Sequence, residues 1–208
     1  MSKPKTFNEL FAFYYQEVKP LYSELSAANE PPIELLLEIN AAFDHMSRHW
    51  QYGEAEEGVV GACSAHLKRC TFDGYKLILK WTRDHYDELM ESKQTRIDVI
   101  DNGMFRGNLI KLWDEIRGSA IAARIAEGNA RSIGDLQGDG WHHAFDLWKA
   151  VYVKCHTLNS EYYLSPKVEW ARTRTRKEMW RDRLVGSVGT VVVGLVINFL
   201  YDFLKSNP

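Results

Sequence analysis

Apolar residues recur every three or four positions along the first half of the chain, which is the spacing of amphipathic helices. A first helix is predicted over residues 7–28, and Pro20 should kink it or divide it in two. After a break at residues 29–32, a second helix is predicted over residues 33–50. One face of this second helix carries Leu36, Ile39, Asn40, Phe43, Met46, Ser47 and Trp50.

The helical spacing continues through the second half. A long helix is predicted from Glu54 to about Met90, bent near Gly74, and a short helix over residues 95–100 precedes a turn at residues 101–103. Two more are predicted over residues 108–127 and 141–158, separated by a glycine-rich link. No segment alternates as a strand does, so the predicted class is all-α: a helical bundle with a C-terminal helical stalk.

The most apolar stretch is LVGSVGTVVVGLVINFLY, residues 184–201, which contains no charged residue. A helix rises about 1.5 Å per residue, so a stretch of this length meets the criterion for crossing a bilayer. Only a short polar end follows it. We therefore predict a single transmembrane helix over residues 184–204 that anchors the chain by its C-terminal end.

A basic segment precedes this stretch: residues 167–183 contain seven lysines or arginines and three acidic residues. Such a bias is typical of a segment kept on the cytoplasmic side, and it suits anionic lipid heads. Nucleic acid is the rival partner, but the adjacent apolar span explains the cluster without it. The residues predicted to contact lipid heads are Arg172, Arg174, Arg176, Lys177, Arg181 and Arg183.

These patterns divide the chain into three parts. Residues 1–164 are predicted to form a cytosolic helical bundle, residues 165–183 a basic juxtamembrane helix, and residues 184–204 the transmembrane anchor. The predicted location is the bacterial inner membrane, crossed once, with the N-terminal domain in the cytoplasm.

Small and polar residues within the predicted anchor fall at steps of four, so on a helix they form one slowly drifting stripe. Small residues allow helix backbones to approach, and an asparagine in hydrocarbon normally finds a partner. The stripe predicts a helix that self-associates, and several associated copies could line a pore. The alternative is a plain membrane anchor with no such contacts. Its members are Gly186, Thr190, Gly194, Asn198 and Asp202.

The composition agrees with a cytosolic domain. The chain has three cysteines, Cys63, Cys70 and Cys155, an odd number that cannot all pair in disulfides, and they form no CxxC motif. This pattern fits free thiols in a reducing compartment. The N-terminus lacks the apolar core of a signal peptide. The formal net charge is −2, unevenly distributed because the C-terminal end is basic.

Several residues could in principle carry chemistry. Cys63, His66 and Cys70 share one helical face, and with His45 and His49 they could converge on a zinc-sized site, but buried cysteines and hydrogen-bonded histidines are the commoner outcome. No nucleophile elbow and no phosphate-binding loop is present. We therefore predict no metal, no cofactor and no catalytic residue of a familiar type.

The residues AAFDHMSRHW, a short link and then GACSAHLKRCTFDGYKLIL resemble the helical hairpins of HEPN-like proteins in prokaryotic conflict systems. The resemblance covers about a fifth of the chain. Catalytic HEPN ribonucleases carry an arginine and a histidine separated by four to six residues, and no such pair occurs here. The resemblance implies a non-catalytic, membrane-associated member of CRISPR-type defence systems.

The sequence thus predicts a membrane-anchored helical effector or scaffold that self-associates through its C-terminal helix and perturbs the membrane in antiviral defence. A defence-system protein or RNA is a further predicted partner. One alternative is a membrane-tethered HEPN-type ribonuclease with an irregular site of His45, Arg48, His49 and His66. Another is a plain tether for a partner enzyme.

Overall fold

The structure is a computed structural model that describes residues 4–27, 31–92, 95–132, 138–175, 177, 180 and 181. The described residues form helices joined by short connections and contain no strand, which confirms the all-α class. In chain order the elements are α1 (Phe7–Phe13), η1 (Tyr14–Val18), α2 (Lys19–Ala27), α3 (Ile33–Tyr52), α4 (Glu56–Glu91), η2 (Ile97–Gly103), α5 (Met104–Ser132), α6 (Asp139–Thr157) and η3 (Leu158–Tyr163).

The first helical run continues past Pro20 because of a local change in helix type. Proline has no N–H and collides with the carbonyl one turn earlier in a regular α-helix. Here the preceding turn, η1, is a π-helix, whose wider ring accommodates the proline at the second position of α2. The Thr6 hydroxyl accepts a hydrogen bond from the Glu9 N–H (3.3 Å) and so caps the start of α1.

Helices α3 and α4 form an antiparallel hairpin, with the turn at Gly53, whose φ of 69° is left-handed. The face predicted for α3 is buried only in part: Met46 is buried, whereas Leu36, Phe43 and Trp50 are 40%, 57% and 63% exposed. The buried side chains are Leu35, Ala42 and Met46. The exposed apolar residues lie directly beside the buried ones on the helix surface, so periodicity alone could not select which edge of this broad apolar face meets α4.

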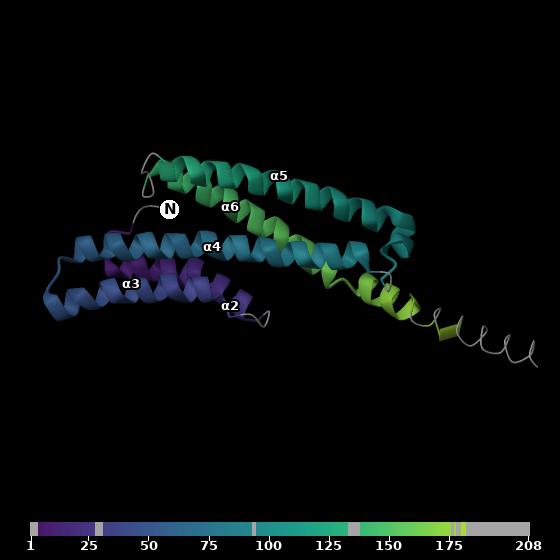
Figure 1. Cartoon of the computed structure of the whole chain (residues 1–208), viewed down its shortest axis with the longest axis horizontal. Coiled ribbons are helices and arrows are strands. Elements are labelled where there is room, and N and C mark those ends of the chain that lie inside the picture. Colours follow the sequence, from purple (N-terminus) through teal and green to yellow (C-terminus); the bar gives the residue numbers. More distant parts are fainter. Residues whose placement is uncertain are drawn as a thin grey trace, which may run out of the picture.

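The 36-residue helix α4 is the central element of the bundle (Figure 1), and it continues through all three of its glycines. Gly74 serves close packing: a Cβ atom there would lie 3.2 Å from Leu21 Cδ1 and 3.5 Å from Leu35 Cδ2. The absence of a side chain therefore lets α2 and α3 approach the middle of α4.

The predicted turn after α4 is present within η2. Asp101, Asn102 and Gly103 all have positive φ values, of 49°, 54° and 87°. Helix α5 then begins four residues earlier than predicted and continues beyond the predicted end at residue 127, through Gly128 and Asn129. Burial of Ala130 and an ion pair between Glu127 and Arg131 across Gly128 sustain the last turn.

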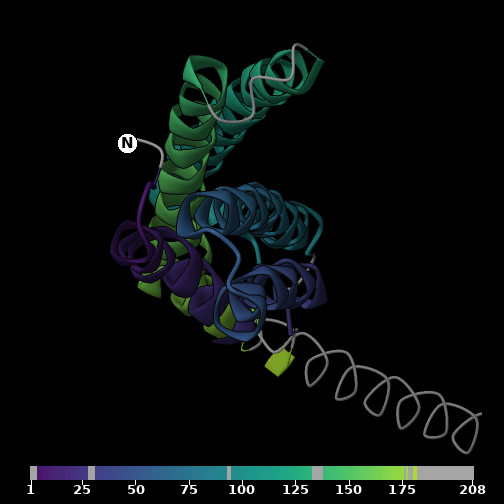
Figure 2. The ribbon, with the colours of Figure 1, turned by 90° about the vertical axis from the view of Figure 1, so that its left-hand side faces the viewer.

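Helices α5 and α6 form a second hairpin, and α6 crosses behind α4 (Figures 1 and 2). The core between the two hairpins is aromatic. The Trp141 ring lies 4.8 Å from Phe145, 5.8 Å from Phe72 and 6.2 Å from Phe13, measured between centroids. These contacts join α1, α4 and α6 into one core.

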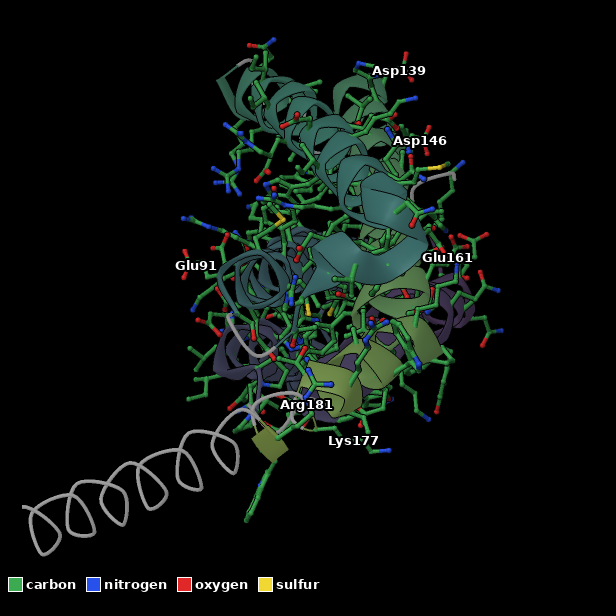
Figure 3. All side chains as sticks on the ribbon, turned by 90° about the vertical axis from the view of Figure 1, so that its right-hand side faces the viewer. Glu91, Asp139, Asp146, Glu161, Lys177 and Arg181 are labelled. Atoms are coloured by element: carbon green, nitrogen blue, oxygen red, sulfur yellow. The ribbon has the colours of Figure 1, made fainter. Side chains whose placement is uncertain are left out.

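The chain continues after η3 as a helix over residues 166–175, which leaves the bundle at the end opposite the α3–α4 turn (Figure 1). Val168, Ala171 and Thr175 are buried, so the first part of the predicted stalk packs on the bundle. Lys177 and Arg181 lie beyond it, on the side away from Asp139 and Asp146 (Figure 3). Among the described helices, none has the length and hydropathy needed to cross a bilayer. The predicted anchor, including Gly186, Thr190, Gly194, Asn198 and Asp202, lies outside the described residues.

Candidate functional site

The α3–α4 hairpin brings together two of the four residues of the predicted irregular site. The rings of His45 and His66 lie 5.1 Å apart between centroids. Both side chains are partly buried between the helices. Two imidazoles at this separation could act together as general acid and general base, provided that a substrate reached them.

The other two residues belong to different environments. Arg48 Nη2 donates to Asp44 Oδ2 (2.8 Å) one turn earlier on α3. His49 Nδ1 lies 2.7 Å from the carbonyl oxygen of Glu54, and its ring packs edge-on against Phe7 (5.1 Å between centroids). His49 therefore supports the hairpin turn instead of joining the histidine pair.

Two residues outside the predicted set, Glu38 and Arg69, hold the ring of His66 in place. His66 Nδ1 lies 2.7 Å from Glu38 Oε2, and Arg69 Nε donates to the same oxygen (3.2 Å). Arg69 Nη2 also lies 2.7 Å from His66 Nδ1, so Glu38, His66 and Arg69 form one connected polar network. Spacing could have found both residues, because Arg69 is three positions after His66 and Glu38 is seven before His45.

Cys63 and Cys70 of the possible zinc site are hydrogen-bonded to backbone carbonyl groups of α3. Cys63 Sγ donates to the Ala42 carbonyl oxygen (3.1 Å), and Cys70 Sγ donates to that of Leu35 (3.7 Å). Burial raises the pKa of Cys63 to about 11 and that of Cys70 to about 12, so both thiols are protonated at neutral pH. The described residues contain no group of three or more histidine, cysteine or acidic side chains arranged for a metal ion.

A second polar cluster holds the start of the C-terminal helix against α4. Arg172 Nη2 donates to Glu88 Oε1 (2.9 Å), and Tyr163 Oη donates to Glu88 Oε2 (2.6 Å). The Tyr163 ring stacks on His85 at 3.6 Å with an interplanar angle of 2°. Burial, followed by the hydrogen bond to Glu88, raises the pKa of Tyr163.

The π-helical turn η3 supplies the other half of this cluster. Asn159, which is 6% exposed, donates through Nδ2 to Thr82 Oγ1 (3.1 Å), and its Oδ1 lies 2.9 Å from His85 Nδ1. A π-helical turn often places a side chain where a regular helix could not. The direction in which the chain leaves the bundle is therefore set by hydrogen bonds and stacking between α4, η3 and residues 166–175.

The basic residues predicted to contact lipid heads fall into two groups. Arg172 belongs to the cluster just described, and its side chain is 30% exposed. Arg174, Lys177 and Arg181 are exposed, and the Arg174 guanidinium lies 5.3 Å from the centre of the Trp170 ring. Arg176 and Arg183 lie outside the residues whose side chains are described.

Comparisons of the chain with protein-family models, with curated proteins and with solved structures give no match. The resemblance to HEPN-like proteins stays a prediction from residues 40–80. The function must accordingly be argued from the residues and the geometry of this chain.

Proposed function

We propose that this protein is a membrane-anchored helical scaffold or effector that acts as a homo-oligomer. The uncharged stretch at residues 184–201 and its basic flank support the membrane attachment. The Glu88–Arg172–Tyr163 contacts support mechanical coupling, because they fix the outgoing helix to the bundle. The resemblance to HEPN-like proteins supports a role in antiviral defence, in which assembly would gather the C-terminal segments and perturb the bilayer.

The observation that carries the oligomer is a partly exposed seam of mostly apolar residues along α3, at one end of which Trp50 stacks on Phe7 (5.2 Å between centroids). Its positions follow one another at steps of three and four, the spacing of a and d positions in a coiled coil. Ile33 and Trp50 at the two ends are 61% and 63% exposed, and Phe43 near the middle is 57% exposed. The seam consists of Ile33, Leu36, Asn40, Phe43, Ser47 and Trp50.

A second copy of the same helix fits this seam in the antiparallel direction. A two-fold axis near residues 41 and 42 pairs Ile33 with Trp50, Leu36 with Ser47, and Asn40 with Phe43, so that larger side chains meet smaller ones. In the C-terminal half of α3, Arg48 is paired with Asp44 of the same helix (2.8 Å), and Glu38 of the N-terminal half is paired with Arg69 (3.2 Å). The fit between copies therefore rests on the size of the side chains and not on their charge.

Replacing Phe43 with glutamate should reduce self-association of the full-length protein in mild detergent. The substitution places two charges in the seam of each dimer, and we expect a loss of about 2 kcal/mol or more of association free energy. Light scattering after gel filtration measures the oligomeric state. Ile125→Glu is the matched control, because Ile125 is 60% exposed on α5, away from the seam.

Within the same experiment, Gly194→Ile tests the contribution of the predicted anchor. An additive loss from Phe43→Glu and Gly194→Ile supports assembly through both surfaces. An unchanged oligomer in Phe43→Glu would show that the α3 seam is not the contact between copies, and a wild-type protein that is monomeric would contradict the oligomer itself.

A second candidate function, ribonuclease activity, is favoured only by the proximity of His45 to His66. A nuclease that used this pair should lose about 10²- to 10⁴-fold in rate in His66→Ala. Arg48→Ala should keep its activity, since Arg48 binds Asp44 and not the histidines. Cleavage of labelled RNA by purified protein measures both variants. No cleavage by the wild type, or equal cleavage by wild type and His66→Ala, would exclude this function.

A further inference from the structure

A basic groove runs between α4 and α5 on the outside of the bundle. These helices have few close backbone contacts, and their side chains enclose a groove with a volume of about 710 Å³. Its lining includes one carboxylate, Asp87, and five basic residues: Lys76, Lys80, Arg83, Arg117 and Arg124. This balance is notable in a chain with 26 basic and 28 acidic residues.

Two contacts fix how the helices face each other across the groove. Lys76 Nζ donates to Glu127 Oε1 (2.9 Å) at one end, and the rings of Tyr86 and Trp113 stack at 4.9 Å near the other. The helices run in opposite directions, as Figure 1 shows. Lys80 lies one turn after Lys76 on α4, and Arg124 lies one turn before Glu127 on α5. Because the helices are antiparallel and Lys76 contacts Glu127, Lys80 and Arg124 occupy the same level on opposite walls of the groove.

Most carboxylates near the groove are engaged by other cations, and Glu34 and Asp84 border Lys80 on its other side without an ion pair to it. Arg83 pairs with Asp87 (3.4 Å) on its own helix, and Arg117 approaches Asp114 (3.8 Å) in the same way. Lys76 is held by Glu127 and Asp73. Within the described part of the chain, neither Lys80 nor Arg124 forms an ion pair or hydrogen bond.

We propose that the groove between α4 and α5 binds a compact ligand that carries two or more phosphate groups. Like charges on facing walls repel each other unless an anion lies between them. The guanidinium of Arg124 can bind a phosphate through two parallel hydrogen bonds, and Lys80 can add a point charge from the opposite wall. One phosphate would lie at this level.

The length of the basic strip sets the size of the ligand. From Lys76 to Arg83 the α4 wall extends about 10 Å, which is enough for two or three linked phosphates but short for a long polymer. The aromatic ring in the lining, Trp113, is only 9% exposed and is covered by Tyr86. A stacking platform of the kind that binds single-stranded nucleic acid is therefore missing from this lining. The compact polyphosphate is the better fit.

The test is a titration of the full-length protein in mild detergent with inorganic tripolyphosphate and, separately, with a nucleoside triphosphate, followed by calorimetry at low salt. We expect saturable one-to-one binding that weakens when the salt concentration is raised to 200 mM. Lys80→Ala and Arg124→Ala should each weaken binding about tenfold or more, because each removes a charged hydrogen bond. Lys111→Ala, an exposed cation of α5 outside the groove, should bind like the wild type.

A charge reversal separates loss of binding from loss of folding. Glutamate at position 124 would face Lys80, so Arg124→Glu should abolish binding while unfolding at the same or a higher temperature than the wild type. Tighter binding of the nucleoside triphosphate than of tripolyphosphate would support a nucleotide as the source, and equal binding an inorganic or other simple polyphosphate.

Three outcomes would overturn the proposal. The first is no binding of either probe at millimolar concentration. The second is binding that Lys80→Ala and Arg124→Ala leave unchanged. The third is binding of an RNA oligonucleotide or of anionic vesicles, but of neither small probe, which would identify a surface for larger polyanions. None of these outcomes depends on the α3 seam or on the anchor, so they are distinguishable from failure of the scaffold function.

Discussion

Replacing Glu127 with alanine is expected to lower the free energy of unfolding by about 3 kcal/mol. The Glu127 carboxylate is 7% exposed and accepts hydrogen bonds from Lys76 (2.9 Å), Arg131 (2.6 Å) and the Trp148 indole N–H (3.1 Å). Trp148 is fully buried, so its N–H would lose its partner without gaining water. Lys76 would still pair with Asp73, and the Arg131 side chain is half exposed to water. The loss of their contacts with Glu127 therefore contributes less to the decrease in stability.

Thermal unfolding followed by circular dichroism measures this effect, which corresponds to a decrease in Tm of about 6–12 °C for a chain of this size. Glu127→Gln should lower the free energy of unfolding by about half as much, because the amide oxygen can still accept the hydrogen bond from the Trp148 indole N–H. Glu115→Ala is the matched control: this α5 carboxylate is 49% exposed and lies 3.9 Å from Lys154, so its removal should change stability by less than about 0.5 kcal/mol. Equal stability of Glu127→Ala and wild type would contradict the structural role given to this carboxylate.

Ending the chain before Arg183 should convert a membrane-bound protein into a soluble one. The stretch 184–201 contains eleven leucine, isoleucine, valine or phenylalanine residues. At about 0.3–0.6 kcal/mol each, these residues favour insertion by roughly 3–7 kcal/mol, whereas basic residues alone support only salt-sensitive attachment. Fractionation of cells expressing the two forms, with carbonate and high-salt extraction of the membranes, measures the difference.

A point substitution makes the same test without shortening the chain. Val192→Arg, near the centre of the stretch, should cost about 2.5–3.5 kcal/mol of insertion free energy and release part of the protein, while Val192→Leu should not. Release of the full-length protein by high salt would refute the anchor and leave only a peripheral contact through the basic residues.

The sequence predicted the helices well because their signals are local. Pro31 and Pro32 mark the start of α3, Gly53 its end, and Asp101–Gly103 the turn before α5; each acts through the dihedral angles of its own residues. The stop predicted at Gly128 was wrong because burial of Ala130 and the pairing of Glu127 with Arg131 outweigh the cost of one glycine in a helix.

The amino-acid sequence by itself determined the all-α class and the order and approximate bounds of the helices. Only the tertiary structure decided which edge of the apolar face of α3 is buried, which acids hold His66 and Arg172, and which cations of α4 and α5 face each other across the groove. The physical reason is that helical periodicity describes one helix at a time. Burial and charge compensation depend on residues far apart in the chain, such as Lys76 with Glu127 and Glu88 with Arg172, which meet only when the helices pack.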